Sequence, residues 1–130
     1  MEKSALVIDD DPMIRGLVKS MLEAEGYLVE LAEDGKQGIE ILENPEKKPE
    51  YSVIILDVVM PGLNGLDVLT RIRMNDAISA FPVLMLTGED KAEDIMAGYN
   101  VGADYYITKP FTRQQLLYGL SLVLSDEVAL

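Results

Sequence analysis

The sequence predicts an α/β fold in which five strands alternate with five helices and form one parallel sheet. Two observations carry this prediction: short apolar runs recur along the chain, and a stretch with the apolar spacing of a helix follows each run. Parallel strands joined in this way need crossover connections, which are right-handed in nearly all cases. Because 130 residues suit one domain and 48% of them are apolar, we expect residues 1–130 to form a single domain.

The first two strand–helix units are marked by turn and capping residues. The short run at 5–8 is rich in β-branched side chains, which favour a buried strand. Asp11 and Pro12 are typical of an N-cap and a first helical position, and Gly26 is typical of a helix end. The expected elements are strands at 5–8 and 27–31, and helices at 12–26 and about 35–43.

The remaining units follow a predicted surface loop at 44–50, which contains two prolines and two lysines. The continuous apolar run at 52–56 predicts a central strand that is covered on both faces. Asp90 with Glu93, and Thr112 with Gln115, have the spacing of capping boxes. The expected elements are strands at 52–56, 82–86 and 104–108, and helices at about 66–73, 90–100 and from 112 onward.

Composition excludes several classes of function. The chain has no cysteine and no histidine, which rules out disulfides, thiolate or imidazole metal sites and a serine–histidine–aspartate triad. Its formal net charge of −12 repels phosphate backbones and anionic lipids, so we expect no direct binding to nucleic acid or membrane. No apolar run is long enough to cross a bilayer, and we expect a soluble, cytoplasmic protein.

Polar residues follow four of the five predicted strands. Asp9 and Asp10 follow the first strand, Asp57 the third, Thr87 the fourth and Lys109 the fifth. Each has a structural alternative, such as a solvent-facing loop carboxylate, an ordinary strand threonine or a solvated lysine. However, the carboxyl ends of parallel strands meet at one edge of the sheet, where ligands bind in such folds. We therefore expect these side chains to form one site.

This set of groups points to phosphoryl transfer. Three carboxylates in one crevice repel one another, so a bound cation or strongly shifted pKa values are expected. Oxygen ligands alone favour a hard cation, and Mg²⁺ (or Mn²⁺) fits best. A carboxylate can attack phosphorus and form an aspartyl phosphate. Lys109 can neutralise phosphoryl oxygens and the Thr87 hydroxyl can donate a hydrogen bond to them.

Five motifs in this order resemble those of the response regulator receiver domains of two-component systems, in the superfamily of chemotaxis regulators. They are VIDDDP at 7–12, DVVMPG at 57–62, LDV at 66–68, LTG at 86–88 and KPF at 109–111, and the resemblance extends from residue 5 to about 124. Each motif alone is weak, whereas five in register are very specific. The resemblance implies a doubly wound, flavodoxin-like three-layer sandwich with strand order 2-1-3-4-5.

The resemblance also implies a role for each site residue. Asp57 accepts a phosphoryl group from a sensor histidine kinase or a phosphotransfer protein, and Lys109 and Thr87 contact the phosphoryl oxygens. The implied metal ligands are Asp9, Asp10, Asp57 and the backbone carbonyl of Val59. A domain of this kind is not a conventional enzyme, since it catalyses only its own phosphorylation and autodephosphorylation.

Tyr106, three residues before Lys109, matches the switch aromatic of the family. The resemblance implies that Thr87 moves toward the phosphoryl group while Tyr106 turns inward. This movement would repack the face formed by the helix at 90–100, the fifth strand and the last helix. The face would then control a downstream protein or an output domain absent from this sequence, with the chain a monomer or a phosphorylation-dependent dimer.

Two alternatives use the same residues differently. A Mg²⁺-dependent phosphohydrolase of the haloacid dehalogenase type would use Asp9 as nucleophile with Asp11 two residues later, but Pro12–Met13 departs from its usual motif and Asp57 is left without a role. A phosphorylation-independent interaction module on the same fold usually lacks one or more site residues, all of which are present here. Labelling is expected to depend on Asp57 in a receiver domain and on Asp9 in the phosphohydrolase.

Overall fold

The computed structural model describes residues 3–46, 50–88 and 92–124, and for residues 92–94 it describes the backbone alone. The strands are β1 (Lys3–Ile8), β2 (Tyr27–Ala32), β3 (Val53–Asp57), β4 (Val83–Gly88) and β5 (Tyr105–Lys109). The helices are α1 (Pro12–Ala24), α2 (Gly35–Leu42), α3 (Gly65–Met74), α4 (Ala92–Val101) and α5 (Arg113–Val123). Every predicted element is confirmed, with bounds that differ by one or two residues. Among the described helices, none is long and apolar enough to cross a membrane.

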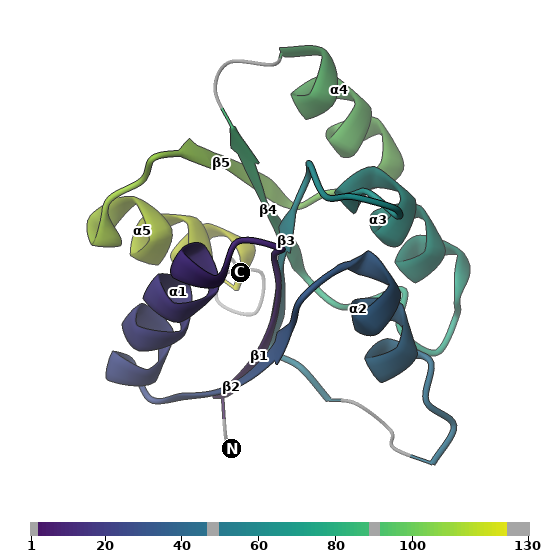
Figure 1. Cartoon of the computed structure of the whole chain (residues 1–130), viewed down its shortest axis with the longest axis horizontal. Helices are drawn as coiled ribbons and strands as arrows, with labels where there is room; N and C mark the ends of the chain where they lie inside the picture. The colour runs from purple at the N-terminus through teal and green to yellow at the C-terminus, as the bar shows by residue number, and fades with distance from the viewer. Residues whose placement is uncertain (1–2, 47–49, 89–91, 125–130) are drawn as a thin grey trace, which may run out of the picture.

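The five strands form one sheet in the order β2-β1-β3-β4-β5, and every neighbouring pair is parallel. Helices α1 and α5 cover one face of this sheet, and α2, α3 and α4 cover the other (Figure 1). The predicted three-layer, doubly wound arrangement is therefore confirmed. The strand order reverses between β1 and β3. The loops that follow these two strands therefore lead to helices on opposite faces of the sheet, and in such folds ligands bind at this edge.

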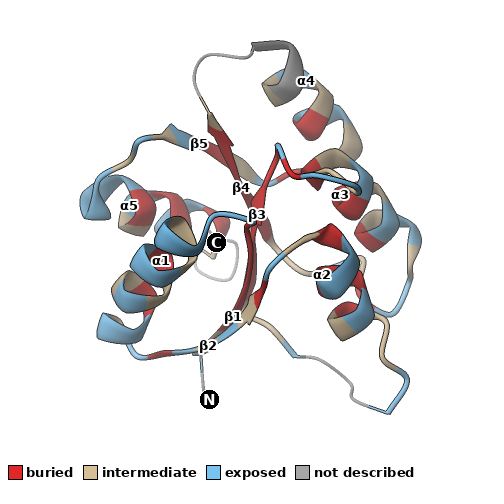
Figure 2. Cartoon of the chain, in the orientation of Figure 1, coloured by how far each residue is buried: buried red, intermediate tan, exposed pale blue. Residues whose placement is uncertain are grey.

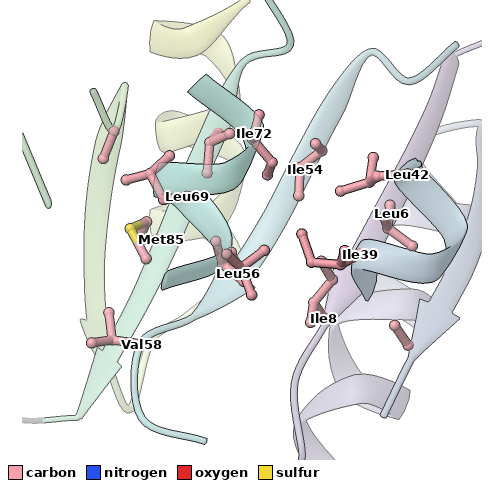
Figure 3. Packing of buried hydrophobic residues seen from close by; sticks show 14 of the residues in the cluster. Leu6, Ile8, Ile39, Leu42, Ile54, Leu56, Val58, Leu69, Ile72 and Met85 are labelled. Carbon is pink, nitrogen blue, oxygen red and sulfur yellow. The ribbon is translucent and has the colours of Figure 1, made fainter. Parts of the chain in front are cut away.

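The core lies on both faces of the sheet, and β3 is buried along its whole length (Figure 2). Leu56 and Met85 pack with Leu69 of α3 on one face (Figure 3), whereas Ile55 packs with residues of α1 and α5 on the other, including Leu22. A strand packed on both faces has little freedom to move. The residue at the end of β3 is therefore held firmly at the sheet edge.

Local capping sets where several helices begin. The Asp11 carboxylate accepts hydrogen bonds from the first turn of α1, and Thr112 and Gln115 form the predicted capping box at the start of α5. Both predictions are confirmed. The predicted Asp90–Glu93 capping box lies outside the described side chains, and residues 47–49 of the predicted loop lie outside the described residues.

Arg73, near the end of α3, ties together three segments at the edge of the sheet opposite the strand-end site. Its guanidinium donates hydrogen bonds to the carbonyls of Gly102 (2.8 Å), Ser79 (2.9 Å) and Phe81 (2.7 Å) and to the Asp104 carboxylate (2.9 Å). The side chain is 19% exposed, so solvent screens these bonds only partly. Arg73 thereby anchors the turn that follows α4.

Replacing Arg73 by methionine is expected to lower the free energy of unfolding by about 2–4 kcal/mol, because several acceptors lose their shared donor. Urea unfolding followed by circular dichroism measures this change. The matched control is Arg71→Met, since Arg71 is 51% exposed and pairs only with Glu43 at 2.7 Å among the described contacts. That control is expected to lose less than about 1 kcal/mol. Equal losses in the two variants would contradict the role assigned to Arg73.

Candidate functional site

The predicted carboxylates meet at the carboxyl end of the sheet. Asp9 directly follows β1, Asp57 is the last residue of β3, and Asp10 lies in the loop that leads to α1. One carboxylate oxygen from each lies within 4.8 Å of the others. Asp9 and Asp57 are buried, at 0% and 3% exposure, whereas Asp10 is exposed. The cluster thus has two buried carboxylates at its base and one at its opening.

Lys109, the last residue of β5, lies between the two buried carboxylates. Its ammonium is 3.0 Å from Oδ2 of Asp9 and 3.2 Å from Oδ1 of Asp57. The peptide between Lys109 and Pro110 is cis. The sequence placed this lysine at the sheet edge, and the structure shows which carboxylates it pairs with.

Backbone and side-chain contacts hold Asp9 in place. Its Oδ1 accepts a hydrogen bond from the backbone N–H of Asp11 (2.9 Å), and its carbonyl accepts one from the guanidinium of Arg15 (2.7 Å). Its own backbone N–H donates to the carbonyl of Ala32 at the end of β2 (3.2 Å). Arg15 was not predicted, because one arginine on an amphipathic helix gives no sequence signal for a contact with a neighbouring loop.

Gly65 makes room for the loop that follows Asp57. A side chain at this position would overlap the carbonyl of Asp57 and lie 2.8 Å from the Cα of Val58. The N–H of Gly65 donates to the carbonyl of Val58 (2.7 Å), so the first residue of α3 lies directly against the end of β3. The close approach requires glycine and fixes the path of the backbone from Asp57 toward Val59.

The electrostatics of the cluster are dominated by burial and by neighbouring carboxylates. Burial, the charge of Asp9 and a hydrogen bond with Asp10 raise the pKa of Asp57, the Lys109 ammonium lowers it, and together these effects bring the pKa to about 7. Burial alone would lower the pKa of Lys109, but the hydrogen bond to Asp9 and the charges of Asp57 and Asp9 outweigh it, so the pKa of Lys109 is raised. Lys109 is therefore charged, and Asp57 titrates near neutral pH.

Thr87 lies in β4, fully buried, and its side-chain oxygen has no hydrogen-bond partner among the described residues. A buried hydroxyl without a partner is uncommon because the lost hydrogen bond costs about 1–3 kcal/mol. β4 pairs with β3 so that Asp57 lies opposite Leu86, the residue before Thr87. Thr87 therefore lies one residue past the end of the strand that carries Asp57, as expected for a group that serves a ligand.

Two further predicted residues lie outside the carboxylate cluster. Val59 follows Asp57 by two residues and is 58% exposed, and only its backbone carbonyl can serve as the predicted ligand because a valine side chain has no ligand atom. Tyr106 in β5 is 8% exposed and packs against α4, with its ring 5.2 Å from the ring of Tyr99. The structure thus places Tyr106 on the face predicted to change during switching.

The donor set fits a hard divalent cation. The three carboxylates supply only oxygen ligands, and the oxygens are close enough to share one ion. The raised pKa of Asp57 shows that these surroundings disfavour its charge, and a cation would relieve that effect. The cluster can therefore hold Mg²⁺.

Comparison with known proteins agrees with this geometry. The uncharacterized transcriptional regulatory protein YkoG of Bacillus subtilis is 39% identical over 125 residues, which are 95% of this chain and 52% of that protein. The response regulator MprA of Mycobacterium sp. (strain KMS) is 37% identical over 119 residues, which are 92% of this chain and 49% of that protein. The chain spans about half the length of these curated relatives.

Solved structures of similar proteins share the fold over nearly the whole chain. The chemotaxis protein CheY4 of Vibrio cholerae superposes with a TM-score of 0.86 at 35% identity, covering 95% of this chain and 100% of that one. A CheY-like receiver domain protein of Methanospirillum hungatei superposes with a TM-score of 0.87 at 29% identity, covering 98% of each chain. The family model described as response regulator receiver domain matches residues 5–120. The chain therefore belongs to the response regulator receiver domain family of two-component systems.

Proposed function

We propose that this chain is a phosphoacceptor domain in which Asp57 takes a phosphoryl group from the phosphohistidine of a histidine kinase or a phosphotransfer protein. The observation that carries the proposal is the Lys109 ammonium between two buried carboxylates, 3.2 Å from Asp57 and 3.0 Å from Asp9. An ion pair that served stability alone would not need a third carboxylate within 4.8 Å of both. The arrangement concentrates charge where a phosphoryl group and a cation can neutralise it.

The reaction is a displacement at phosphorus. An oxygen of the ionised Asp57 carboxylate forms the new O–P bond as the P–N bond to the donor imidazole breaks, and the leaving nitrogen takes a proton. Asp9, Asp10, Asp57 and the backbone carbonyl of Val59 would hold Mg²⁺. When bound, the ion would supply positive charge to the phosphoryl oxygens.

The chain's own residues complete the site. Lys109 is within 3.2 Å of the acceptor carboxylate, so its charge lies beside any phosphoryl group formed there. The buried Thr87 hydroxyl, which has no partner among the described residues, gains one when it donates to a phosphoryl oxygen. That gain provides the driving force for Thr87 to move during the proposed switch, in which Tyr106 also takes part.

The proposal is tested by incubating the protein with acetyl phosphate and Mg²⁺ and measuring its intact mass. One added phosphoryl group is expected on the wild type, labile to hydroxylamine as an acyl phosphate is. In the phosphohydrolase alternative, labelling would survive Asp57→Asn and be lost in Asp9→Asn. An unlabelled wild type would refute the proposal and favour a phosphorylation-independent interaction module.

Lys109→Ala is expected to accept the phosphoryl group on Asp57 but to lose the response that follows. The variant keeps the nucleophile, whereas the cation that links the new charge to β5 is gone. The chemical-shift changes that phosphorylation causes at Tyr106 measure this response by NMR. Lys19→Ala is the control, because Lys19 lies on α1 and pairs with Glu23 at 3.8 Å. Changes of wild-type size in Lys109→Ala would refute the role.

The proposed output is a change of the face formed by α4, β5 and α5, which would control a downstream protein or an output domain. Several relatives are named transcriptional regulatory proteins and are about twice as long as this chain. The proposed upstream partner is a histidine kinase, and the chain would act as a monomer or as a phosphorylation-dependent dimer. Residues 1–130 are proposed to form a single receiver domain.

A further inference from the structure

Gly98 lies in the middle of α4 and is buried, at a position where glycine is unfavourable. Glycine destabilises a helix interior relative to alanine because its backbone loses more conformational freedom on folding. Gly98 is followed by three further helical residues, so it does not serve as the end of the helix. Its place in α4 therefore needs a reason other than helix formation.

The reason is the ring of Tyr106. A methyl group on Gly98 would overlap the hydroxyl and Cζ of Tyr106 and would lie 2.5 Å from Cε2. Tyr106 is 8% exposed, and the centroid of its ring lies 5.2 Å from that of Tyr99. Tyr106 thus occupies the space that any side chain at position 98 would take.

Hydrogen bonds hold both the backbone of β5 at Tyr106 and the backbone of α4 at Gly98 against a movement that would relieve such an overlap. On one side, the backbone of Tyr106 in the edge strand β5 is paired with Met85 of β4. On the other side, the carbonyl of Gly98 accepts a hydrogen bond from the N–H of Gly102 (2.9 Å), and Arg73 holds the carbonyl of Gly102 (2.8 Å). The movable part is the Tyr106 side chain, which can rotate about its Cα–Cβ bond. A side chain at position 98 would therefore expel the ring.

We propose that Gly98 is a positioning residue of the switch: its missing side chain makes the space for the inward ring of Tyr106 and so sets the balance between inward and outward positions. Tyr106 also lines a cavity of about 180 Å³ beside β5. That cavity is lined by Tyr105, Tyr106, Ile107, Thr108, Gln115 and Tyr118.

The inference rests on the proposed function in one respect, the coupling of the ring to Asp57. If the inward position of the ring favours the phosphorylated form by some factor, then a substitution that excludes the ring from this position must weaken the binding of a phosphoryl mimic by up to that factor. Gly98→Ala is therefore expected to reduce the affinity for beryllofluoride with Mg²⁺ by about 5–50-fold, the usual size of such coupling. Gly98 does not contact Asp57, so direct loss of a ligand cannot explain this effect.

A double-mutant cycle tests the steric part without any ligand. Gly98→Ala is expected to lower Tm in the wild-type background and to raise it in a Tyr106→Ala background, where the methyl group meets no ring. Gly16→Ala is the matched control, because a side chain at this helical glycine of α1 has nothing within 4 Å. The control is expected to raise Tm by about 2–4 °C in both backgrounds. If Gly98→Ala alone does not fold, the double variant must still be at least as stable as Tyr106→Ala.

Fluorine NMR of fluorotyrosine-labelled protein reports the ring position, with the Tyr106 signal assigned by its absence in Tyr106→Phe. A signal that becomes solvent-exposed in Gly98→Ala supports the inference, and a signal that stays buried, or a cycle without coupling, overturns it. An exposed ring with unchanged beryllofluoride affinity overturns the link to the site while Asp57 labelling, and so the proposed function, stands. A wild type that binds no beryllofluoride and takes no label overturns both the proposed function and the link between the ring and Asp57.

Discussion

The Asp57→Asn protein is expected to take up no phosphoryl group from acetyl phosphate and Mg²⁺, under conditions in which the wild type takes up one. The amide has nearly the same shape as the carboxylate but is not a nucleophile toward phosphorus. Asp57 is 3% exposed at the end of a fully buried strand, and the equal size of the amide is expected to leave the fold intact. Intact-mass spectrometry measures the loss. Asp76→Asn, at an exposed position after α3, is the control and keeps wild-type labelling.

The same substitution is expected to stabilise the metal-free protein at pH 8. The pKa of Asp57 is raised from 3.8 to about 7, which means that the folded surroundings disfavour its ionised form. After allowance for solvent screening, removal of this charge is expected to raise the free energy of unfolding by about 1–2 kcal/mol, or Tm by about 3–8 °C. Differential scanning calorimetry in the presence of a chelator measures the change.

The pH dependence follows from the direction of the pKa shift. A carboxyl group whose pKa is raised on folding binds its proton more tightly in the folded state, so protonation stabilises the fold as pH falls. In the wild type this stabilisation begins near pH 7 and is complete below about pH 4. The advantage of Asp57→Asn is therefore greatest above pH 7 and shrinks toward pH 4. A constant advantage across this range would show that ionisation of Asp57 is not its cause.

The fold was predictable because its signals are local. Each strand is an apolar run bounded by turn or capping residues, and the order of strands and helices determines that the sheet is parallel. The candidate site was predictable for the same reason, since Asp9, Asp57, Thr87 and Lys109 each lie at a strand end. Sequence position alone brought them to one edge, before any contact between side chains was known.

Contacts between distant segments were not predictable. Arg73 reaches Gly102 and Asp104 over about thirty residues of chain, and no periodic pattern connects such positions. The capping box of Asn64 and Asp67 was also missed, because an aspartate replaces the usual glutamate or glutamine. The space at Gly98 depends on a ring from β5, so the sequence shows only an ordinary helical glycine. These contacts arise from packing in three dimensions.

Removing Mg²⁺ is expected to abolish labelling of the wild type and to lower its stability. With a chelator, Asp9, Asp10 and Asp57 repel one another, and Lys109 is the only described cation that pairs with the two buried carboxylates. Added Mg²⁺ binds the folded state alone and is expected to raise Tm by an amount that grows with the logarithm of its concentration. Asp57→Asn lacks one ligand, so Mg²⁺ is expected to raise its Tm less than it raises the Tm of the wild type at pH 8.

The Mg²⁺ response should also depend on pH, because binding requires the ionised form of Asp57. Below its pKa of about 7, Asp57 carries a proton that Mg²⁺ must displace. The affinity is therefore expected to fall by up to about tenfold for each unit of pH below 7, with release of one proton for each ion bound. Isothermal titration calorimetry in buffers of different ionisation enthalpy counts the released protons. Equal affinity at pH 6 and pH 8 without proton release would show that Asp57 does not bind the metal. The acceptor carboxylate would then have to act outside the coordination sphere of Mg²⁺.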